Sequence, residues 1–324
     1  GDFTMLPCRP LLAALLAAPA VARAQAPYPS RPVRVVVPFA AGGIIDVVAR
    51  IISEPLSRRL GQPIVIENTP GAGSTIGARN VARAAPDGYT LLLNGAAHGV
   101  IPALFPDAGI DPVVDFAPVA LLGEQPFILA VHPGVPANDV PSLLAWLRSK
   151  RGEATFATTG IGAASHLAGE LLKTLAGVDF TIVQYRGTPA AVTDFVAGRV
   201  EFMIDSQTLI APLMQDGRAR GLAVTTARRS RLVPNLPTLQ EAGVAGYETS
   251  SWQALYAPAA TPPAILRVLT DATLAVLADP AVQQRYAERG VEPRPGDAAA
   301  LRNFLKAEMD RWLPILRSSG ARAG

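Results

Sequence analysis

The chain has 324 residues, of which 49% are hydrophobic and 17% are charged, and its formal net charge at pH 7 is +3. A chain of this length and apolar content can bury a sizeable core in each of about two domains. The small net charge excludes the strongly basic surface of a nucleic-acid-binding protein, so we expect no nucleic-acid partner.

Residues 1–26 predict a secretory signal peptide. Arg9 provides a positive charge, the run LLAALLAAPAVA at 11–22 is apolar but too short to span a bilayer, and ARA at 22–24 and AQA at 24–26 match the cleavage pattern. A buried N-terminal helix is the alternative. We expect the mature chain to start at Gln25 or Pro27 and to be periplasmic. Cleavage would remove Cys8, the single cysteine, and with it any disulfide or thiol chemistry.

Segments typical of strands and helices alternate from residue 33 onward. In the first half we expect strands at 33–39, 63–69 and 88–94, and helices at 46–61 and within 71–85. The pattern restarts after 113–134, with strands at 153–159, 180–187, 201–206 and 219–226 and helices at 142–152, 160–177 and 188–200. A loop-rich segment at 235–263 then precedes a helical tail. This alternation predicts parallel α/β sheets.

The two halves resemble each other, because each contains a strand, a short glycine-containing loop and a helix, at 35–60 and at 154–176. We therefore expect an α/β fold with two lobes and a cleft between them. We divide the chain into the signal peptide (1–26), a first domain (27–125 plus 247–324) and a second domain (126–246). The tail helices are expected to return to the first lobe.

Glycines between a strand and a helix let the backbone turn sharply and approach a ligand closely. They also expose the first N–H groups of the helix, which together with the helix dipole form an anion site. A tight turn without a ligand is the alternative for any single loop. Nucleotide sites are not favoured, because no lysine follows a glycine loop and neither GAGSTIG at 71–77 nor GIGAAS at 160–165 has the spacing of a dinucleotide-binding loop.

Catalytic and metal sites have little support in the sequence. The three histidines, at 98, 132 and 166, are not spaced as metal ligands usually are, and there is no Gly-x-Ser-x-Gly motif. Ser165 and His166 would point about 100° apart on a helix, which places them poorly as a nucleophile and its base. We expect no enzyme activity, no metal and no cofactor.

Four stretches together resemble the Bug receptors, the periplasmic solute-binding proteins of tripartite tricarboxylate transporters (the TctC family). They are YPSRPVRVVVPFAAGGIIDVVAR, VIENTPGAGSTIGARNVARAAPDGYTLLL, TTGIGAASHLAGELL and QYRGTPAAVTDFVAGRVEFMID. The resemblance covers nearly the whole chain after the signal peptide. It implies a periplasmic binding protein of type II-like fold, a monomer whose hinged domains close on one small organic acid, with the membrane subunits of the transporter as partners.

In the first lobe, the resemblance implies ligand contacts from the loops that follow three strands: Phe39, Ala40, Gly42, Gly43, Ile44 and Asp46, then Gly73 and Ser74, then Ala96, Ala97 and His98. Asp46 either caps the helix or meets a polar group of the ligand. His98 either adds hydrogen-bonding specificity or lies on the surface. We expect Gly43 to need close backbone approach and a positive φ. The paired isoleucines at 44 and 45 depart from the family pattern and favour an aromatic or alkyl acid over citrate.

In the second lobe, the implied contacts are Thr158, Thr159, Gly160, Gly162, Ala163, Ser165, Tyr185, Arg186, Gly187 and Asp205. Arg186 either contacts a second carboxylate of the ligand or is a surface arginine. Asp205 is expected to face the cleft, where it disfavours a second negative charge or holds a ligand donor, and His166 is expected to be a packing residue. The loops at 39–44 and 158–165 should face one another, beyond the carboxyl ends of the strands.

Two other functions remain open. A ligand sensor that signals to a membrane partner would have the same sequence features as a transport receptor. A periplasmic enzyme on the same two-lobe scaffold is the third possibility.

Overall fold

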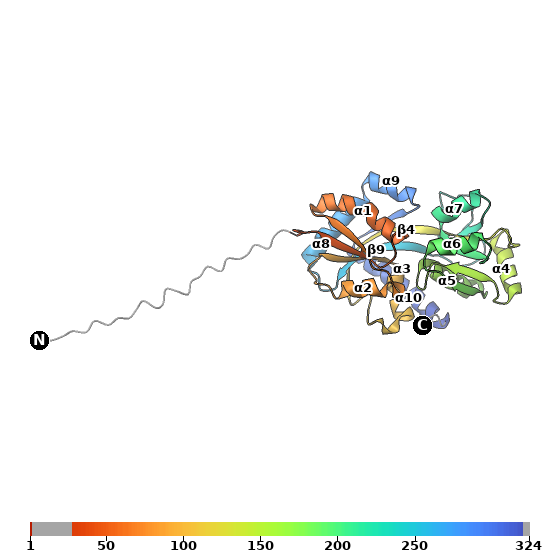
Figure 1. Ribbon diagram of the computed structural model, residues 1–324, viewed down its shortest axis with the longest axis horizontal. Coiled ribbons are helices and arrows are strands. Elements are labelled where there is room, and N and C mark those ends of the chain that lie inside the picture. Colours follow the sequence, from red (N-terminus) through yellow and green to blue (C-terminus); the bar gives the residue numbers. More distant parts are fainter. Residues whose placement is uncertain (2–27, 320–324) are drawn as a thin grey trace.

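The computed structural model describes residues 1 and 28–319, so the predicted signal peptide lies outside the described residues apart from Gly1. Figure 1 shows two α/β lobes side by side, joined by the long strand β4 (Phe116–Val131), by β9 (Ser250–Pro258) and by the C-terminal helix α10 (Ala298–Ser319). The prediction of a two-lobe α/β fold is confirmed. Within the described part of the chain, no helix is long and apolar enough to cross a membrane.

The first lobe is built on a sheet in the order β2–β1–β3–β9–β4, with β10 also paired to β4. Its remaining strands are β1 (Val33–Val37), β2 (Ile64–Asn68), β3 (Thr90–Gly95) and β10 (Glu292–Gly296). Strands β1, β2 and β3 run parallel, but β9 is antiparallel to both β3 and β4. The parallel strands that we expected are present, but the sheet is mixed, because β9 lies in the segment that we expected to be rich in loops. Its residues 251–258 are all buried, so the strand has no polar alternation that would reveal it.

The second lobe uses the other end of β4. Its sheet continues in the order β4–β7–β5–β6, and β8 also pairs with β4. These strands are β5 (Thr155–Thr158), β6 (Thr181–Gln184), β7 (Phe202–Ser206) and β8 (Arg220–Val224). Strands β5, β6 and β7 are parallel, whereas β4 is antiparallel to β7 and β8.

Helices cover both faces of each sheet. In the first lobe, one apolar core includes residues of α1 (Ile44–Leu60), α8 (Pro263–Leu277) and α9 (Pro280–Glu288), and another includes residues of α2 (Thr75–Ala82), α3 (Ala96–Leu104) and α10. In the second lobe, α4 (Val140–Lys150) and α5 (Ala164–Ala176) contribute to one core, and α6 (Thr188–Val196) and α7 (Gln207–Gln215) to the other. Two short 3-10 turns, Ala72–Ser74 and Pro106–Ala108, complete the described elements.

The lobes are joined at three places. Strand β4 changes partner between Pro126, which pairs with Ser250 of β9, and Phe127, which pairs with Ser206 of β7. The chain returns to the first lobe just after Thr249, whose N–H still donates to the carbonyl of Thr225.

The third connection is α10. Its Leu301 and Leu305 pack in the first-lobe core, but its Trp312 and Leu316 pack in the second. The tail helices α8 and α9 pack on the first lobe, as their contacts with α1 show, whereas α10 is shared between the lobes. The carboxylate of Glu308 on α10 links the two cores. Its Oε2 accepts from the indole N–H of Trp252 at 2.8 Å and of Trp312 at 3.1 Å.

Replacing Glu308 by alanine should lower the free energy of unfolding by about 2–4 kcal/mol, because two buried indole N–H groups lose their acceptor. Glu308→Gln should stay closer to wild type, since its amide oxygen can still accept. Urea unfolding followed by fluorescence measures the change.

The matched control is Asp310→Ala on the same helix, which removes only an exposed ion pair with Lys306 and should cost less than about 0.5 kcal/mol. Equal stability of the Glu308→Ala and Asp310→Ala proteins would show that Glu308 does not tie the lobes together.

Candidate functional site

The carboxyl ends of the parallel strands in both lobes lie toward the junction between the lobes. In the first lobe, Gly95 at the end of β3 pairs with Gln253, near the start of β9 where that strand enters from the junction. In the second lobe, Ser206 at the end of β7 pairs with Phe127, where β4 leaves the junction. The loops after β1, β2 and β3 and those after β5, β6 and β7 therefore lie at the two edges that border the junction, where the predicted site residues are found.

The loop between β1 and α1 is fixed from behind by Asp46. The Asp46 carboxylate is 2% exposed and accepts from the N–H of Gly42 at 2.9 Å, from Nε of Arg50 at 2.9 Å and from Nδ2 of Asn68 at 3.0 Å. Burial alone would raise the pKa of Asp46, but the hydrogen bonds from Arg50, Gly42 and Asn68 hold it below its ordinary value. This arrangement favours the structural alternative for Asp46 over a ligand contact, although the residue does not cap α1 directly.

The glycine that needs a positive φ in this loop is Gly42, not Gly43. Gly42 has φ +86°, whereas Gly43 has φ −71° and a Cβ there would have ordinary contacts. Within residues 28–319, the N–H groups of Ala40, Ala41 and Ile44 make no hydrogen bond. Ile44 is the first residue of α1, so its N–H adds to the partial positive charge of the helix start, and Ala40 and Ala41 lie in the loop that precedes the helix.

Ile44 and Ile45, which follow the glycines, give no information about the type of ligand. Ile45 is buried in the first-lobe core, and Ile44 is half-buried and packs against it. Their hydrophobicity is explained by this packing, so it does not bear on the choice between an alkyl acid and citrate.

The second first-lobe loop has an unusual backbone. Ala72, Gly73 and Ser74 all have positive φ, at 42°, 57° and 80°. A Cβ at Gly73 would lie 2.2 Å from the Phe105 ring, so glycine is required there for packing. The Ser74 hydroxyl is buried and faces the side-chain amide of Asn94 at 3.4 Å. Strain of this kind is frequent at ligand-binding loops.

His98 is not on the surface, so that alternative was wrong, and its contribution to ligand specificity stays a prediction. It is fully buried, with its ring 4.4 Å from that of Tyr256 and 4.7 Å from that of Phe116 (centroid distances). Burial lowers its pKa to about 4, so the ring is neutral at physiological pH. His98 belongs to the first-lobe core, and Ala96 and Ala97 are the residues at the start of α3 that remain near the junction.

The sequence analysis missed two asparagines. Asn68 at the end of β2 donates to the carbonyl of Phe39 at 3.1 Å and to Asp46, and the fully buried Asn94 near the end of β3 accepts from the N–H of Gly95 at 2.8 Å. Both are asparagines near the carboxyl end of a strand whose middle is apolar, which is the signal that would have identified them.

The loop between β5 and α5 is the second-lobe counterpart of the loop between β1 and α1. Oγ of Ser165 accepts from the N–H of Thr159 at 3.1 Å, and Nδ1 of His166 accepts from the N–H of Gly162 at 3.2 Å. Gly160 and Gly162 have φ +140° and +77°. In the part of the chain that the structure describes, the N–H groups of Gly160, Ile161 and Ala164 make no hydrogen bond, so this loop also presents free donors.

In the loop after β6, the predicted residues Tyr185 and Arg186 differ in their partners. The Tyr185 hydroxyl donates its proton to Asp194 at 2.8 Å, so towards a ligand this oxygen could act only as an acceptor. The Arg186 guanidinium is exposed and has no hydrogen bond or ion pair among the described residues. Gly187, with φ +109°, precedes α6.

Asp205, near the end of β7, is 7% exposed. Its Oδ1 accepts from the N–H of Ser206 at 2.6 Å, but its Oδ2 has no hydrogen-bond partner within residues 28–319. Burial raises the pKa of Asp205 to about 6, so a fraction of the molecules carries a proton on this carboxyl near neutral pH.

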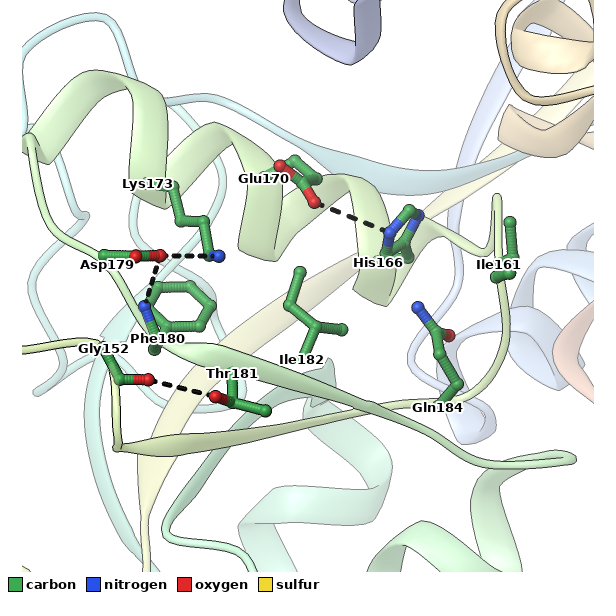
Figure 2. Close-up of a pocket in the computed structure, with 10 residues that line it drawn as sticks. All are labelled: Gly152, Ile161, His166, Glu170, Lys173, Asp179, Phe180, Thr181, Ile182 and Gln184. Atoms are coloured by element: carbon green, nitrogen blue, oxygen red, sulfur yellow. Dashed lines mark hydrogen bonds and ion pairs between the residues drawn. The ribbon is translucent and has the colours of Figure 1, made fainter. Parts of the chain in front are cut away.

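A cavity of about 420 Å³ lies between α5 and β6 (Figure 2). Its wall includes His166, Glu170 and Lys173 from α5 and Phe180, Ile182 and Gln184 on the β6 side. The ammonium of Lys173 is paired with Asp179 at 2.8 Å. With two carboxylates and one paired cation in its lining, the cavity does not suit a carboxylate ligand, and the free N–H groups at the junction suit one better.

The Asp46 contacts predict a pH-dependent stability. A carboxyl whose pKa is lowered on folding stabilises the protein above its ordinary pKa, and this contribution is lost as the pH falls through the folded-state value. The free energy of unfolding of wild type should therefore exceed that of Asp46→Asn at neutral pH, and the difference should shrink toward zero below the ordinary pKa of 3.8.

Urea unfolding at several pH values measures this difference. The control is Asp271→Asn, which changes an exposed carboxylate on α8 and should show no comparable pH dependence. If wild type and Asp46→Asn differ in their free energy of unfolding by the same amount in neutral and in strongly acidic buffer, the stabilising role of the ionised Asp46 is contradicted.

Comparison with known proteins agrees with this architecture. The family model described as the tripartite tricarboxylate transporter family receptor, TctC, matches residues 48–321. Three solved structures are similar. The periplasmic binding protein BugD is 35% identical with a TM-score of 0.82, covering 91% of this chain and 100% of its own. Rpa4515 of R. palustris with adipate is 36% identical with a TM-score of 0.83, at the same coverage.

The third structure is MatC of Rhodopseudomonas palustris with bound malate, which is 37% identical with a TM-score of 0.81 and covers 89% of this chain and 100% of its own. The resemblance to the Bug and TctC receptors is therefore confirmed. With two α/β lobes joined as in these periplasmic binding proteins, the chain belongs to the tripartite tricarboxylate transporter receptor family.

Proposed function

We propose that this protein is a periplasmic receptor that captures a small organic acid between its two lobes and delivers it to the membrane subunits of a tripartite tricarboxylate transporter. The observation that carries the proposal is the pair of loops with free N–H donors, one at the start of α1 and one at the start of α5. Several oriented amides at a helix start satisfy a planar carboxylate without a lysine or arginine. Adipate and malate in the similar structures support this class of ligand.

The contacts that we propose are main-chain contacts for the most part. In the first lobe they come from residues 39–44, 73–74 and 96–97. In the second lobe they come from Thr158 to Ser165 and from the main chain at 185–187. Asp46 and the Tyr185 hydroxyl serve the loops from behind, and His98 serves the core. We keep the division at 27–125 plus 247–324 and 126–246 as the proposed domains, with α10 packed on both.

Two side chains would decide which acid is bound. Arg186 is exposed and has no ion pair among the described residues, and in our proposal it binds a second carboxylate, which favours a dicarboxylate. Asp205 offers either a carboxylate that accepts from a ligand hydroxyl or a protonated carboxyl that donates to a ligand oxygen. The second form is favoured at lower pH.

We further propose that the protein acts as a monomer, binds its acid without changing it, and uses neither metal nor cofactor. Recovery of an unchanged acid after incubation would separate this receptor from an enzyme on the same scaffold. A sensor would bind its acid equally well, so the identity of the membrane partner separates it from a transport receptor.

A thermal-shift screen tests the proposed ligand class. Adipate or malate at about 100 times its Kd would add about 2.7 kcal/mol of stability and raise Tm by about 4 °C. The control is 1,6-diaminohexane, a dication of similar length to adipate, which should give no shift. Stabilisation by the diamine and by no organic acid would refute the proposal.

The Gly160→Val variant tests the second-lobe loop. Because Gly160 has φ +140°, valine would distort the loop, and we expect the Kd for the acid to rise more than about tenfold, which is 1.4 kcal/mol. Gly217→Val is the matched control, since Gly217 in the same lobe also has positive φ and lies away from the junction after α7. The control should lose stability but keep its affinity. Wild-type affinity in Gly160→Val would exclude the second-lobe loop from the site.

Mass spectrometry of the exported protein tests the proposed signal peptide. We expect a first residue of Gln25 or Pro27, since the cleavage pattern ends before each of them. An exported chain that retains residues 11–22 would contradict this.

A further inference from the structure

The loops that precede α1 and α5 are held by the same arrangement of side-chain contacts. In the first lobe, the N–H of Gly42 donates to Asp46, four residues later, and Asp46 pairs with Arg50, a further four residues later. In the second lobe, the N–H of Gly162 donates to Nδ1 of His166, and Nε2 of His166 lies 3.7 Å from Oε1 of Glu170. The spacing of glycine, acceptor and charged partner is identical. The acceptor is a carboxylate paired with a cation in the first lobe, and an imidazole close to a carboxylate in the second.

The backbone repeats as well. Gly42 and Gly162 both have positive φ, at +86° and +77°. The residues that follow them, Gly43 and Ala163, are extended, and each precedes the first residue of a helix, Ile44 or Ala164. Neither helix has a side-chain cap at that residue. The acceptor in the first turn therefore fixes the loop by way of the glycine N–H, in place of a conventional N-cap.

From this repeat we infer that His166 is a positioning residue for ligand binding: its Nδ1 holds Gly162 so that the free N–H groups of Gly160 and Ile161 face the junction between the lobes. The inference rests on the proposed function, because it assigns to His166 the loop that we propose to bind the acid. It replaces the expectation that His166 merely packs.

The hydrogen bond fixes the form of the imidazole. Nδ1 accepts from Gly162, so a neutral ring must carry its proton on Nε2, on the side of Glu170 and the cavity (Figure 2). His166 is 3% exposed, and burial together with the charge of Lys173 lowers its pKa to about 4. The ring therefore stays neutral and keeps its acceptor at physiological pH. A neutral acceptor also avoids placing a negative charge beneath the second carboxylate-binding loop.

Gly162 lies where the lobes meet, so its position affects both the loop and the packing between the lobes. A Cβ on Gly162 would lie 3.1 Å from Cδ1 of Leu104 and 3.7 Å from Cγ2 of Val100, and both residues belong to α3, which follows the first-lobe strand β3. Loss of the His166 tie would free a loop that both presents the donors and touches the opposite lobe.

The chain offers a matched control. His132 accepts from the N–H of Gly134 through Nδ1 at 3.1 Å, in an exposed turn at the end of β4 that lies outside the proposed site. His132→Leu therefore removes the same kind of bond without touching the loops at the junction.

The test uses adipate and malate as probes, with Kd measured by calorimetry for wild type, His166→Leu, His166→Asn and His132→Leu. Leucine removes the acceptor, so His166→Leu should raise Kd about tenfold and speed hydrogen exchange at the Gly162 amide. Asparagine can place its carbonyl oxygen near the position of Nδ1, so His166→Asn should recover most of the affinity. His132→Leu should stay within about twofold of wild type.

A second measurement needs no variant. Nitrogen NMR of wild type should show His166 neutral with its proton on Nε2, and a proton on Nδ1 would overturn the inference even if His166→Leu fails to fold. An unchanged Kd in folded His166→Leu, or a loss in His166→Asn as large as in His166→Leu, would overturn it as well. A wild-type protein that binds no organic acid at all overturns the proposed function itself, which distinguishes the two failures.

Discussion

The structure depends on one strand that belongs to two sheets. Strand β4 pairs with β9 up to Pro126 and with β7 from Phe127 onward. A proline at this step has no N–H to donate, so it suits the residue at which the ladder changes partner. Because β4 is antiparallel to its neighbours in both sheets, the carboxyl ends of the parallel strands in both lobes turn toward the same junction. The position of the candidate site follows from this register.

In the loops that border this junction, several main-chain N–H groups of the described residues make no hydrogen bond. The donors at the starts of α1 and α5 would be ineffective on loose loops, since an anion site of this kind needs N–H groups that converge. Side chains that bond to the loop backbone supply the rigidity. In the first lobe Asp46 accepts from the N–H of Gly42 and Asn68 donates to the carbonyl of Phe39, and in the second lobe Ser165 and His166 accept from loop N–H groups. These side chains thus serve the candidate site by fixing the backbone of its loops.

The C-terminal helix limits how the lobes move relative to one another. Its first half packs in the first-lobe core and its second half in the second, and Glu308 accepts from one tryptophan of each core. Val100 and Leu104 of α3 also contribute to the second-lobe core. Any closing motion must therefore keep α3, α5 and α10 in contact while the angle at β4 changes, which is a small rearrangement of packed helices around a strand hinge.

The sequence by itself determined the features that depend on local chemistry. The alternation of β1 to β3 and β5 to β8 with α1, α2, α4, α5 and α6, the glycine loops and the lack of a phosphate-binding lysine are visible in short stretches, because turns need glycine and buried strands need apolar residues. Tertiary structure alone decided the rest. Strand β9 is buried on both faces and flanked by loop-forming residues, so its pattern resembled a loop. Asp46, Tyr185 and His98 looked like site residues, but Arg50, Asp194 and the rings of Phe116 and Tyr256 take up their polar groups or cover them. Such partners lie on neighbouring turns or distant segments, and only folding decides which of them a polar side chain meets.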